Sequence, residues 1–188
     1  ELLAAARKPL LIVGGGGWSD KARRDLETFA TAHEVPVSAS FRCQDYFDNL
    51  HAAYAGHVGI GISPKFAERI RDSDLIIALG ARLGEITTSG YSLFDIPQPK
   101  QPLVHSYPDP EEIGRVYAPT LGIVSGSAAF AAAISRLEPR HRPRGDAFKA
   151  AHADYLAYAE PTTSPGNVQL ARIVRDLSER LPEDAIIC

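Results

Sequence analysis

The sequence predicts an α/β fold in which a parallel sheet of about six strands is covered by helices on both faces. Three observations predict it: short apolar runs without polar alternation, helical patterns between those runs, and glycines directly after the first run. Strands buried on both faces form continuous apolar runs, whereas half-exposed strands alternate. Because strand and helix patterns take turns along the chain, we expect right-handed crossovers and a parallel sheet.

The apolar runs give the expected strands. Five runs are predicted to be strands buried on both sides, at residues 10–13, 35–39, 75–79, 103–104 and 121–124. Helical spacing follows the first run, at Ala22, Leu26, Phe29 and Ala30, and returns after the last, at Phe130, Ile134 and Leu137. This order is typical of a Rossmann-like, doubly wound sheet, in which ligands bind beyond the carboxyl ends of the strands.

The helical pattern is interrupted after Leu137 by the stretch EPRHRPRGDAF, which is typical of a surface connector. We predict a first domain over residues 1–138, a linker over 139–166 that includes a polar helix at about 146–159, and the start of another domain over 167–188. This last segment combines a helical stripe, ended by Pro182, with a strand that begins in DAIIC. Because one strand cannot bury itself, we expect a truncated domain. The chain begins with Glu1 and contains no methionine, which favours a piece of a longer reading frame.

The composition is that of an ordinary globular protein. Hydrophobic residues make up 45% and charged residues 23%, and the net charge of −3 disfavours nucleic acid as a partner. Two cysteines, Cys43 and Cys188, support neither a disulfide framework nor a zinc site, and the six histidines lack metal-site spacing. No apolar run suits a membrane span and no leader is apparent, so we expect a cytoplasmic protein.

A glycine turn, Gly14, Gly15 and Gly16 within PLLIVGGGGWSD, is the first candidate site. A strand, glycines and a helix start together place free N–H groups at the positive end of a helix dipole, where a phosphate binds. Against the dinucleotide fingerprint, however, Ser19 stands where the third glycine belongs, and the second strand ends without the ribose-binding acid. Phosphate contact and a purely structural tight turn both remain open.

Two further candidates follow later strands. In LGARLGE, Gly80 permits a close approach and Arg82 suits a bidentate contact with phosphate, although a loop arginine is commonly solvated or ion-paired. In HSYPDPEEIG, Asp109 and Pro110 are expected to begin a helix, where acidic residues satisfy the dipole for structural reasons.

Five stretches in order and spacing carry a family resemblance: RKPLLIVGGGGWSD, YAGHVGIGISP, SDLIIALGARLGE, LVHSYPDPEEIGRVY and NVQLARIVRDLSERLPEDAII. They resemble the central domain of acetolactate-synthase-like thiamine diphosphate enzymes, running into the C-terminal domain. The resemblance implies a parent with three domains, in which the cofactor lies between the outer two. It also implies that a glutamate of the N-terminal domain and a Gly-Asp-Gly motif of the C-terminal domain serve the cofactor and magnesium. Neither falls within residues 1–188, so we expect this chain alone to be catalytically inert.

The resemblance also bears on nucleotide binding, because such central domains hold FAD, ADP or no nucleotide. The glycine turn, Gly80 and Arg82 match positions near a bound nucleotide. Tyr107 stands where the family carries an acid, leaving Asp109, and Ser127 replaces the acid of a Gly-Asp pair. Each lost contact weakens binding by about 1–3 kcal/mol, which disfavours tight FAD. The implied partners are the N- and C-terminal domains of the same parent chain and further copies of it in a homo-oligomer.

Two alternatives belong to other functional classes. An autonomous nucleotide-dependent enzyme of related fold, such as a sirtuin-like deacylase, is disfavoured because sirtuin-like proteins commonly carry four zinc cysteines and this chain has two. A pure subunit-interaction module would assemble in solution as the isolated chain.

Overall fold

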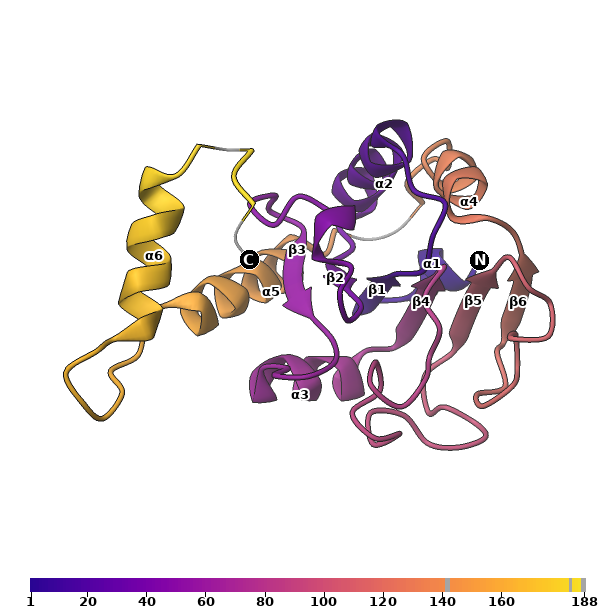
Figure 1. Cartoon of the computed structure of the whole chain (residues 1–188). Coiled ribbons are helices and arrows are strands. Elements are labelled where there is room, and N and C mark those ends of the chain that lie inside the picture. Colours follow the sequence, from indigo (N-terminus) through magenta and orange to yellow (C-terminus); the bar gives the residue numbers. More distant parts are fainter. Residues whose placement is uncertain (141–142, 183, 187–188) are drawn as a thin grey trace. The chain divides into compact units, whose positions relative to one another are not determined.

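A computed structural model describes residues 1–140, 143–182 and 184–186. Its elements in chain order are α1 (Leu2–Ala5), β1 (Pro9–Val13), α2 (Asp20–His33), β2 (Val37–Ala39), the 3-10 helix η1 (Gln44–Tyr46), β3 (Tyr54–His57), α3 (Pro64–Asp72), β4 (Leu75–Leu79), β5 (Leu103–Tyr107), β6 (Leu121–Val124), α4 (Ser127–Ile134), α5 (Gly145–Ala159) and α6 (Leu170–Arg180). The six strands form one sheet in the order β3-β2-β1-β4-β5-β6 (Figure 1). Every pair is parallel, which confirms the predicted fold class.

The sheet changes direction at its centre. The chain builds outward from β1 through β2 to β3, returns to the other side of β1 as β4, and continues to β5 and β6. Leu11 of β1 is therefore paired with Val37 of β2 on one side and with Ile77 of β4 on the other. The loops after β1 and β4 leave the same edge of the sheet in opposite directions, and this switch point is where ligands bind in such folds.

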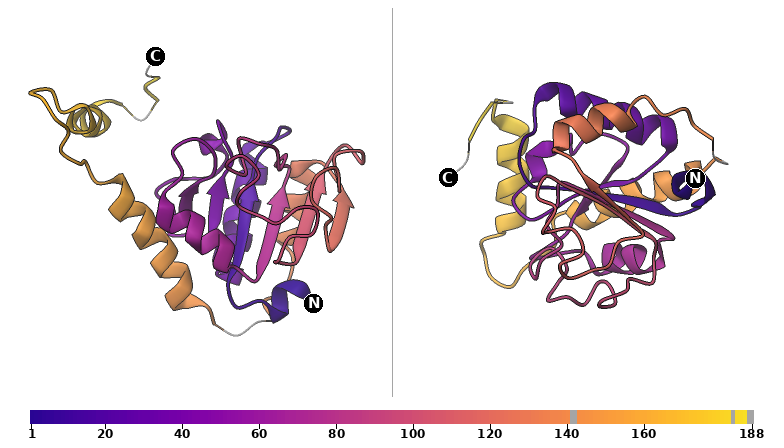
Figure 2. Two further views of the ribbon diagram at one scale, coloured as in Figure 1. Left: turned by 90° about the horizontal axis from the view of Figure 1, so that it is seen from below. Right: turned by 90° about the vertical axis from the view of Figure 1, so that its right-hand side faces the viewer.

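Both faces of the central strands are buried. On one face, Leu11 and Val13 pack with Leu26 and Phe29 of α2, and on the other, Leu10 packs in a cluster that includes residues of α3. Figure 2 shows α2 and α4 on one side of the sheet and α3 on the other. Burial on two sides explains why β1 and β4 are unbroken apolar runs in the sequence.

Local capping fixes where the helices begin. The Ser19 hydroxyl accepts a hydrogen bond from the Ala22 amide (3.2 Å) at the start of α2, and Ser63 serves α3 in the same way ahead of Pro64. Helix α2 ends at Glu34, whose left-handed conformation (φ 49°) stops the helical ladder.

Three local expectations were wrong and one strand was not predicted. No helix begins at Pro110, because residues 108–120 between β5 and β6 form turns and bends, with Gly114 in a left-handed conformation (φ 84°). Strand β6 is not buried on both sides, because it forms the sheet edge and leaves Leu121 47% exposed. Strand β3, the other edge, was missed. Leu137 lies beyond the end of α4.

The chain divides into two compact units, residues 1–155 and 156–188. Helices α5 and α6 occur where helices were predicted, and the part of α5 up to Tyr155 belongs to the first unit. Within it, Asp154 pairs with Lys65 (2.6 Å) and with Arg69 of α3. In the second unit, Arg175 of α6 pairs with Glu160 (3.2 Å).

The domain boundaries at 138 and 166 stay predictions. The strand expected over 184–188 falls partly outside the described residues, and the described part, 184–186, is not in a strand. In the portion of the chain that the structure covers, no helix has the length and apolar character needed to cross a membrane.

Candidate functional site

The predicted glycines of the β1 and β4 loops meet at the switch point. A Cβ atom on Gly15 (φ +72°) would lie 2.1 Å from the Gly80 carbonyl oxygen, and one on Gly80 (φ +65°) would lie 2.7 Å from the Gly14 carbonyl oxygen. A Cβ on Gly14 would lie 2.3 Å from the Ser40 hydroxyl. Glycine is therefore needed at these positions so that two backbones can touch.

Gly16 differs from the other predicted glycines. A Cβ added there meets none of the described atoms within 4 Å, and its backbone is not in the left-handed region. It faces open space at the carboxyl edge of the sheet. Of Gly14, Gly15 and Gly16, Gly16 is thus the position around which free space, rather than internal packing, is found.

Trp18 covers the glycine turn, a feature that the sequence analysis did not identify. Its indole Nε1 donates a hydrogen bond to the Gly14 carbonyl (2.9 Å), and its ring stacks on Tyr46 of η1 with centroids 5.3 Å apart. The Ser19 hydroxyl already accepts the Ala22 amide at the start of α2. The protein therefore satisfies part of this turn and helix start by itself, without a phosphate.

Arg82 forms an ion pair instead of standing free. Its Nη2 lies 3.0 Å from Oε2 of Glu112, which is also 3.7 Å from Nη1 of Arg115. The Glu112 side chain is 8% exposed and that of Arg82 is 61% exposed. Glu112 belongs to the stretch in which acidic residues were expected to cap a helix, so its pairing with Arg82 was not foreseen. The positive charge that Arg82 would offer to a phosphate is therefore already balanced by the Glu112 carboxylate.

His105 lies buried beside this ion pair. Its Nε2 is 3.1 Å from the Ala81 carbonyl oxygen. Burial lowers the pKa of His105, although the bond to Ala81 and the charge of Glu112 favour the protonated form. In the neutral form, the tautomer protonated at Nε2 donates to this carbonyl. A cavity of about 10 Å³ between His105, Glu112 and Tyr117 is no larger than a water molecule needs.

Asp109, the last predicted site residue, has a local role. Its Oδ1 accepts a hydrogen bond from the Glu111 amide (2.9 Å), which shapes the turn after β5. Among the described residues, no hydrogen bond or ion pair joins Asp109 to the glycine turn or to Arg82. Nearby, at the start of α4, the Ser127 hydroxyl is buried against Gly80 and has no hydrogen-bond partner in the part of the chain described.

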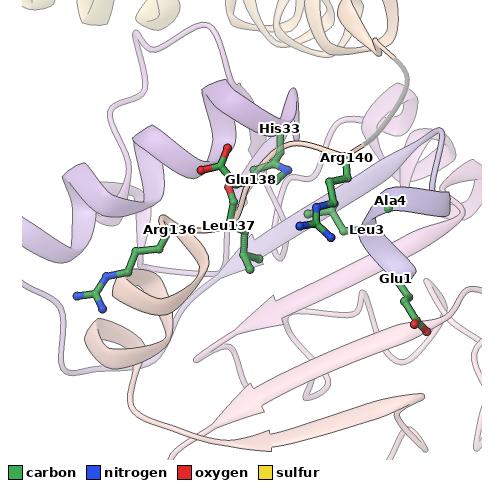
Figure 3. A pocket seen from close by; sticks show the side chains of 8 residues that line it. All are labelled: Glu1, Leu3, Ala4, His33, Arg136, Leu137, Glu138 and Arg140. Carbon is green, nitrogen blue, oxygen red and sulfur yellow. The ribbon is translucent and has the colours of Figure 1, made fainter.

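A larger hollow lies elsewhere, beside α1. It has a volume of about 430 Å³, and its walls come from α1, the end of α2 and the segment after α4 (Figure 3). Its lining residues are Glu1, Leu3, Ala4, His33, Arg136, Leu137, Glu138 and Arg140. The exposed side chains of Arg136, Glu138 and Arg140, in the segment after α4, lie at the border of this hollow. It is separate from the predicted site, since none of its lining residues belongs to the loops after β1 or β4.

The sheet order and the glycine contacts at its switch point define a Rossmann-like domain, and comparison with known proteins assigns its family. Residues 1–134 match the family model described as thiamine pyrophosphate enzyme, central domain. The chain belongs to this family, as the five stretches of sequence had indicated.

The similar curated proteins include enzymes of two names. An acetolactate synthase of Mycobacterium avium is 30% identical over 164 residues, covering 87% of this chain and 25% of that protein. A sulfoacetaldehyde acetyltransferase of Alcaligenes xylosoxydans xylosoxydans is 30% identical over 157 residues, covering 84% and 26%. An acetolactate synthase large subunit of Corynebacterium glutamicum is 27% identical over 199 residues, covering 100% and 30%. The chain thus spans about a quarter of the length of these relatives.

The family implies thiamine diphosphate in the parent enzymes. Within residues 1–140, 143–182 and 184–186, no three His, Cys, Asp or Glu side chains gather so that they could hold a metal ion.

Proposed function

We propose that this chain supplies the non-catalytic central domain of a thiamine diphosphate-dependent enzyme that forms or breaks a carbon–carbon bond next to a carbonyl group, as a transferase or lyase. Thiamine diphosphate and magnesium are held by the N- and C-terminal domains of the same parent chain. The family match over residues 1–134 and the greater length of the relatives support this assignment. The relatives carry names with different substrates, so the proposal extends to the reaction class. A cytoplasmic homo-oligomer is part of the same proposal.

The carboxyl edge of the sheet, in this proposal, holds neither FAD nor ADP tightly. The observation that carries this is the pairing of Arg82 with the buried Glu112. A phosphate that recruits Arg82 must draw it away from Glu112. Because the Arg82 side chain is 61% exposed although Glu112 is buried, this ion pair contributes about 1 kcal/mol. The acidic contacts replaced by Tyr107 and Ser127 weaken binding by about 1–3 kcal/mol each. Together these losses lower affinity by roughly two to five powers of ten.

The test of nucleotide content uses the full-length parent protein. Its visible absorbance is recorded, and the small molecules released on denaturation are identified by mass. We expect no flavin bands and no stoichiometric adenine nucleotide. One equivalent of FAD or ADP per chain would overturn this part of the proposal. In that case, Arg82→Ala would show whether Arg82 contacts the phosphate of the bound nucleotide or whether the nucleotide is held by other residues. Arg24→Ala, at an exposed position, is the matched control.

The non-catalytic assignment has its own test. The 188-residue chain is incubated with thiamine diphosphate, magnesium and a 2-oxo acid as the two-carbon donor, in parallel with the full-length parent. We expect turnover by the parent and none by the isolated chain. Efficient turnover by the 188-residue chain would refute the assignment, whatever nucleotide the parent contains.

A further inference from the structure

The two edges of the sheet are protected to different degrees. At the β3 edge, the Val37 N–H of β2 donates to the Ala53 carbonyl (2.8 Å), so the next carbonyl, that of Tyr54, points away from the sheet. His152 of α5 donates to this Tyr54 carbonyl through Nδ1 (2.8 Å), and the Tyr155 ring packs edge-on against the Tyr54 ring, with centroids 4.8 Å apart. The part of α5 up to Tyr155 therefore covers the β3 edge, beside which it lies (Figure 1).

The β6 edge has no such cover in the part of the chain that the structure describes. Strand β6 is the last in the sheet order, and no strand occurs in residues 156–182 or 184–186. The Ser125 N–H donates to the Tyr107 carbonyl of β5 (3.1 Å). Because main-chain groups of neighbouring residues in a strand point to opposite sides, the N–H and C=O groups of Gly122 and Val124 point away from β5. The described residues give these groups no hydrogen-bond partner.

The β6 edge also lacks the residues that keep strand edges from pairing. Natural proteins protect a free edge with charged side chains, proline or a bulge. Residues 121–125 read LGIVS, and residues 118–135 contain no Asp, Glu, Lys, Arg or His, although 23% of the chain is charged. Leu121 is 47% exposed and Val124 is 61% exposed. An exposed, apolar and uncharged edge of this kind is suited to pair with another strand.

We propose that the β6 edge pairs with the β6 edge of a second copy of this chain, antiparallel and centred on Ile123, so that two six-stranded sheets join into one. In this register, Gly122 of each copy lies opposite Val124 of the other, and each such pair exchanges both of its N–H···O=C hydrogen bonds. The inference names the contact surface of the homo-oligomer proposed above and rests on that part of the proposal.

The side chains on both faces of β6 suit this two-fold contact. On the face where Ile123 packs against the core, Ile123 would lie opposite Ile123 of the second copy, with Cα atoms about 4.5 Å apart, the spacing of a non-hydrogen-bonded pair. On the other face, Gly122 has no side chain, and a Cβ atom there would lie 2.7 Å from Ile113 Cγ2. Val124 of the second copy would therefore pack over Gly122 against Ile113, which is partly exposed.

The absence of charge favours a second copy over a different partner. A two-fold contact brings identical groups together near its axis, so a charge there would be repelled by its own copy. Residues 118–135 carry none, and α4, within this stretch, exposes Ala129 and Ala133. The same axis places both α4 helices on one face of the joined sheet, which extends the uncharged contact toward the roughly 1,000 Å² that a stable interface buries.

The test uses cysteine substitutions in the full-length parent. Ile123→Cys places two thiols opposite each other across the axis, at a Cα distance that a disulfide can span. Leu121→Cys is the matched control on the same face, because the two copies of residue 121 would lie about 13 Å apart along the paired strands. Under mild oxidation we expect an interchain disulfide between the two copies of position 123, and roughly tenfold less linkage at position 121. Mass mapping of the linked peptides identifies any linkage through Cys43 or Cys188.

A second substitution tests the hydrogen bonds. Val124→Pro removes the outward N–H but no hydrogen bond to β5, and edge strands tolerate proline at such positions. Added to Ile123→Cys, it deletes one hydrogen bond from each of the two pairs, so the disulfide between the copies of position 123 should form about tenfold more slowly. An unchanged rate would contradict the pairing.

Hydrogen exchange of the unchanged parent, resolved to single residues, needs no variant. The Gly122 and Val124 amides should exchange as slowly as the Ser125 amide, which is bonded to β5. Fast exchange at both residues would show that the edge is free and would overturn the proposal. Slow exchange without a link between the copies of position 123 would show that another strand covers the edge, which overturns it as well.

The outcomes separate this inference from the proposed function. Light scattering gives the mass of the parent assembly. If the parent is an oligomer whose thiols at position 123 do not link, or link no better than those at position 121, the β6 contact is refuted and the oligomer stands. A monomeric parent would refute both. Turnover of the parent with thiamine diphosphate is measured separately and tests the reaction class alone.

Discussion

Arg144 fastens the start of α5 to the first unit, and its removal should cost the fold several kcal/mol. Its side chain is 5% exposed, and its guanidinium donates to the backbone carbonyls of Leu3, Ala6 and His33, with Nη1 2.6 Å from the His33 oxygen and Nε 3.0 Å from the Ala6 oxygen. Arg144→Ala leaves three acceptors without this donor. At about 1 kcal/mol for each acceptor, the low end of the range for buried groups, the loss is roughly 3 kcal/mol.

Urea denaturation followed by far-UV circular dichroism measures this loss. Arg144→Lys keeps the charge but not the planar set of donors, so it should fall between the native chain and Arg144→Ala. Arg24→Ala, on the exposed side of α2, is the control and should change the free energy of unfolding by less than about 0.5 kcal/mol. If Arg144→Ala and Arg24→Ala lose the same small amount, the carbonyl contacts of Arg144 contribute nothing and the reasoning is refuted.

Three further predictions concern the switch point and two titrating groups. Gly80→Ala should lower the free energy of unfolding by about 2 kcal/mol or more, because Gly80 has a φ of +65° and lies close to the Gly14 oxygen. Gly16 lies in open space, so Gly16→Ala should change the free energy of unfolding by less than about 1 kcal/mol. Thermal melts of both variants measure this difference, and equal effects would contradict the backbone contact. Burial lowers the pKa of His105, so the unfolded chain binds more protons and the free energy of unfolding falls as the pH drops below about 6.5. In urea titrations from pH 5 to 7, the free energy of unfolding of His105→Gln should depend less on pH than that of the unchanged protein. An equal pH dependence would contradict this role of His105. Burial alone would raise the pKa of Asp154, but Lys65 and Arg69 outweigh it and lower that pKa. The stabilisation by Asp154 is therefore present above about pH 4 and is lost as the pH falls through the lowered pKa. In an acid titration, Asp154→Asn should not show this loss of stability.

The centre of the fold was predictable from the sequence, and its margins were not. Strands β1 and β4 are buried on both faces, so burial alone makes their residues apolar. Strand β6, at one edge, lacks that constraint, and it was recognised as a strand but not as an exposed one. Strand β3, at the other edge, is buried, but it reads Tyr-Ala-Gly-His, with a glycine and no β-branched residue, so no apolar run marks it. The helix expected at Pro110 failed because acidic residues and proline suit turns as well as helix starts.

The position of the loops that carry the candidate site residues was predictable, but the pairings of their side chains were not. Strand ends determine where a loop lies, so Gly14, Gly80 and Arg82 could be assigned to the carboxyl edge from the strand pattern alone. Which side chain meets Arg82 depends on the path of the turns after β5, and periodicity does not describe turns. Glu112 was visible as an acidic residue, but its burial against Arg82 is a tertiary property. The cover that Trp18 forms over Gly14 also depends on η1, where Tyr46 lies.

The position of Trp18 gives the protein a built-in optical reporter. It is the single tryptophan among 188 residues, and its indole rests on the Gly14 carbonyl and on Tyr46. A molecule that hydrogen-bonds to the Gly14 carbonyl must displace the Trp18 indole from it, which changes the emission of Trp18. Fluorescence of the unlabelled chain therefore reports events at the switch point, and because the chain holds no second tryptophan, the signal comes from one place.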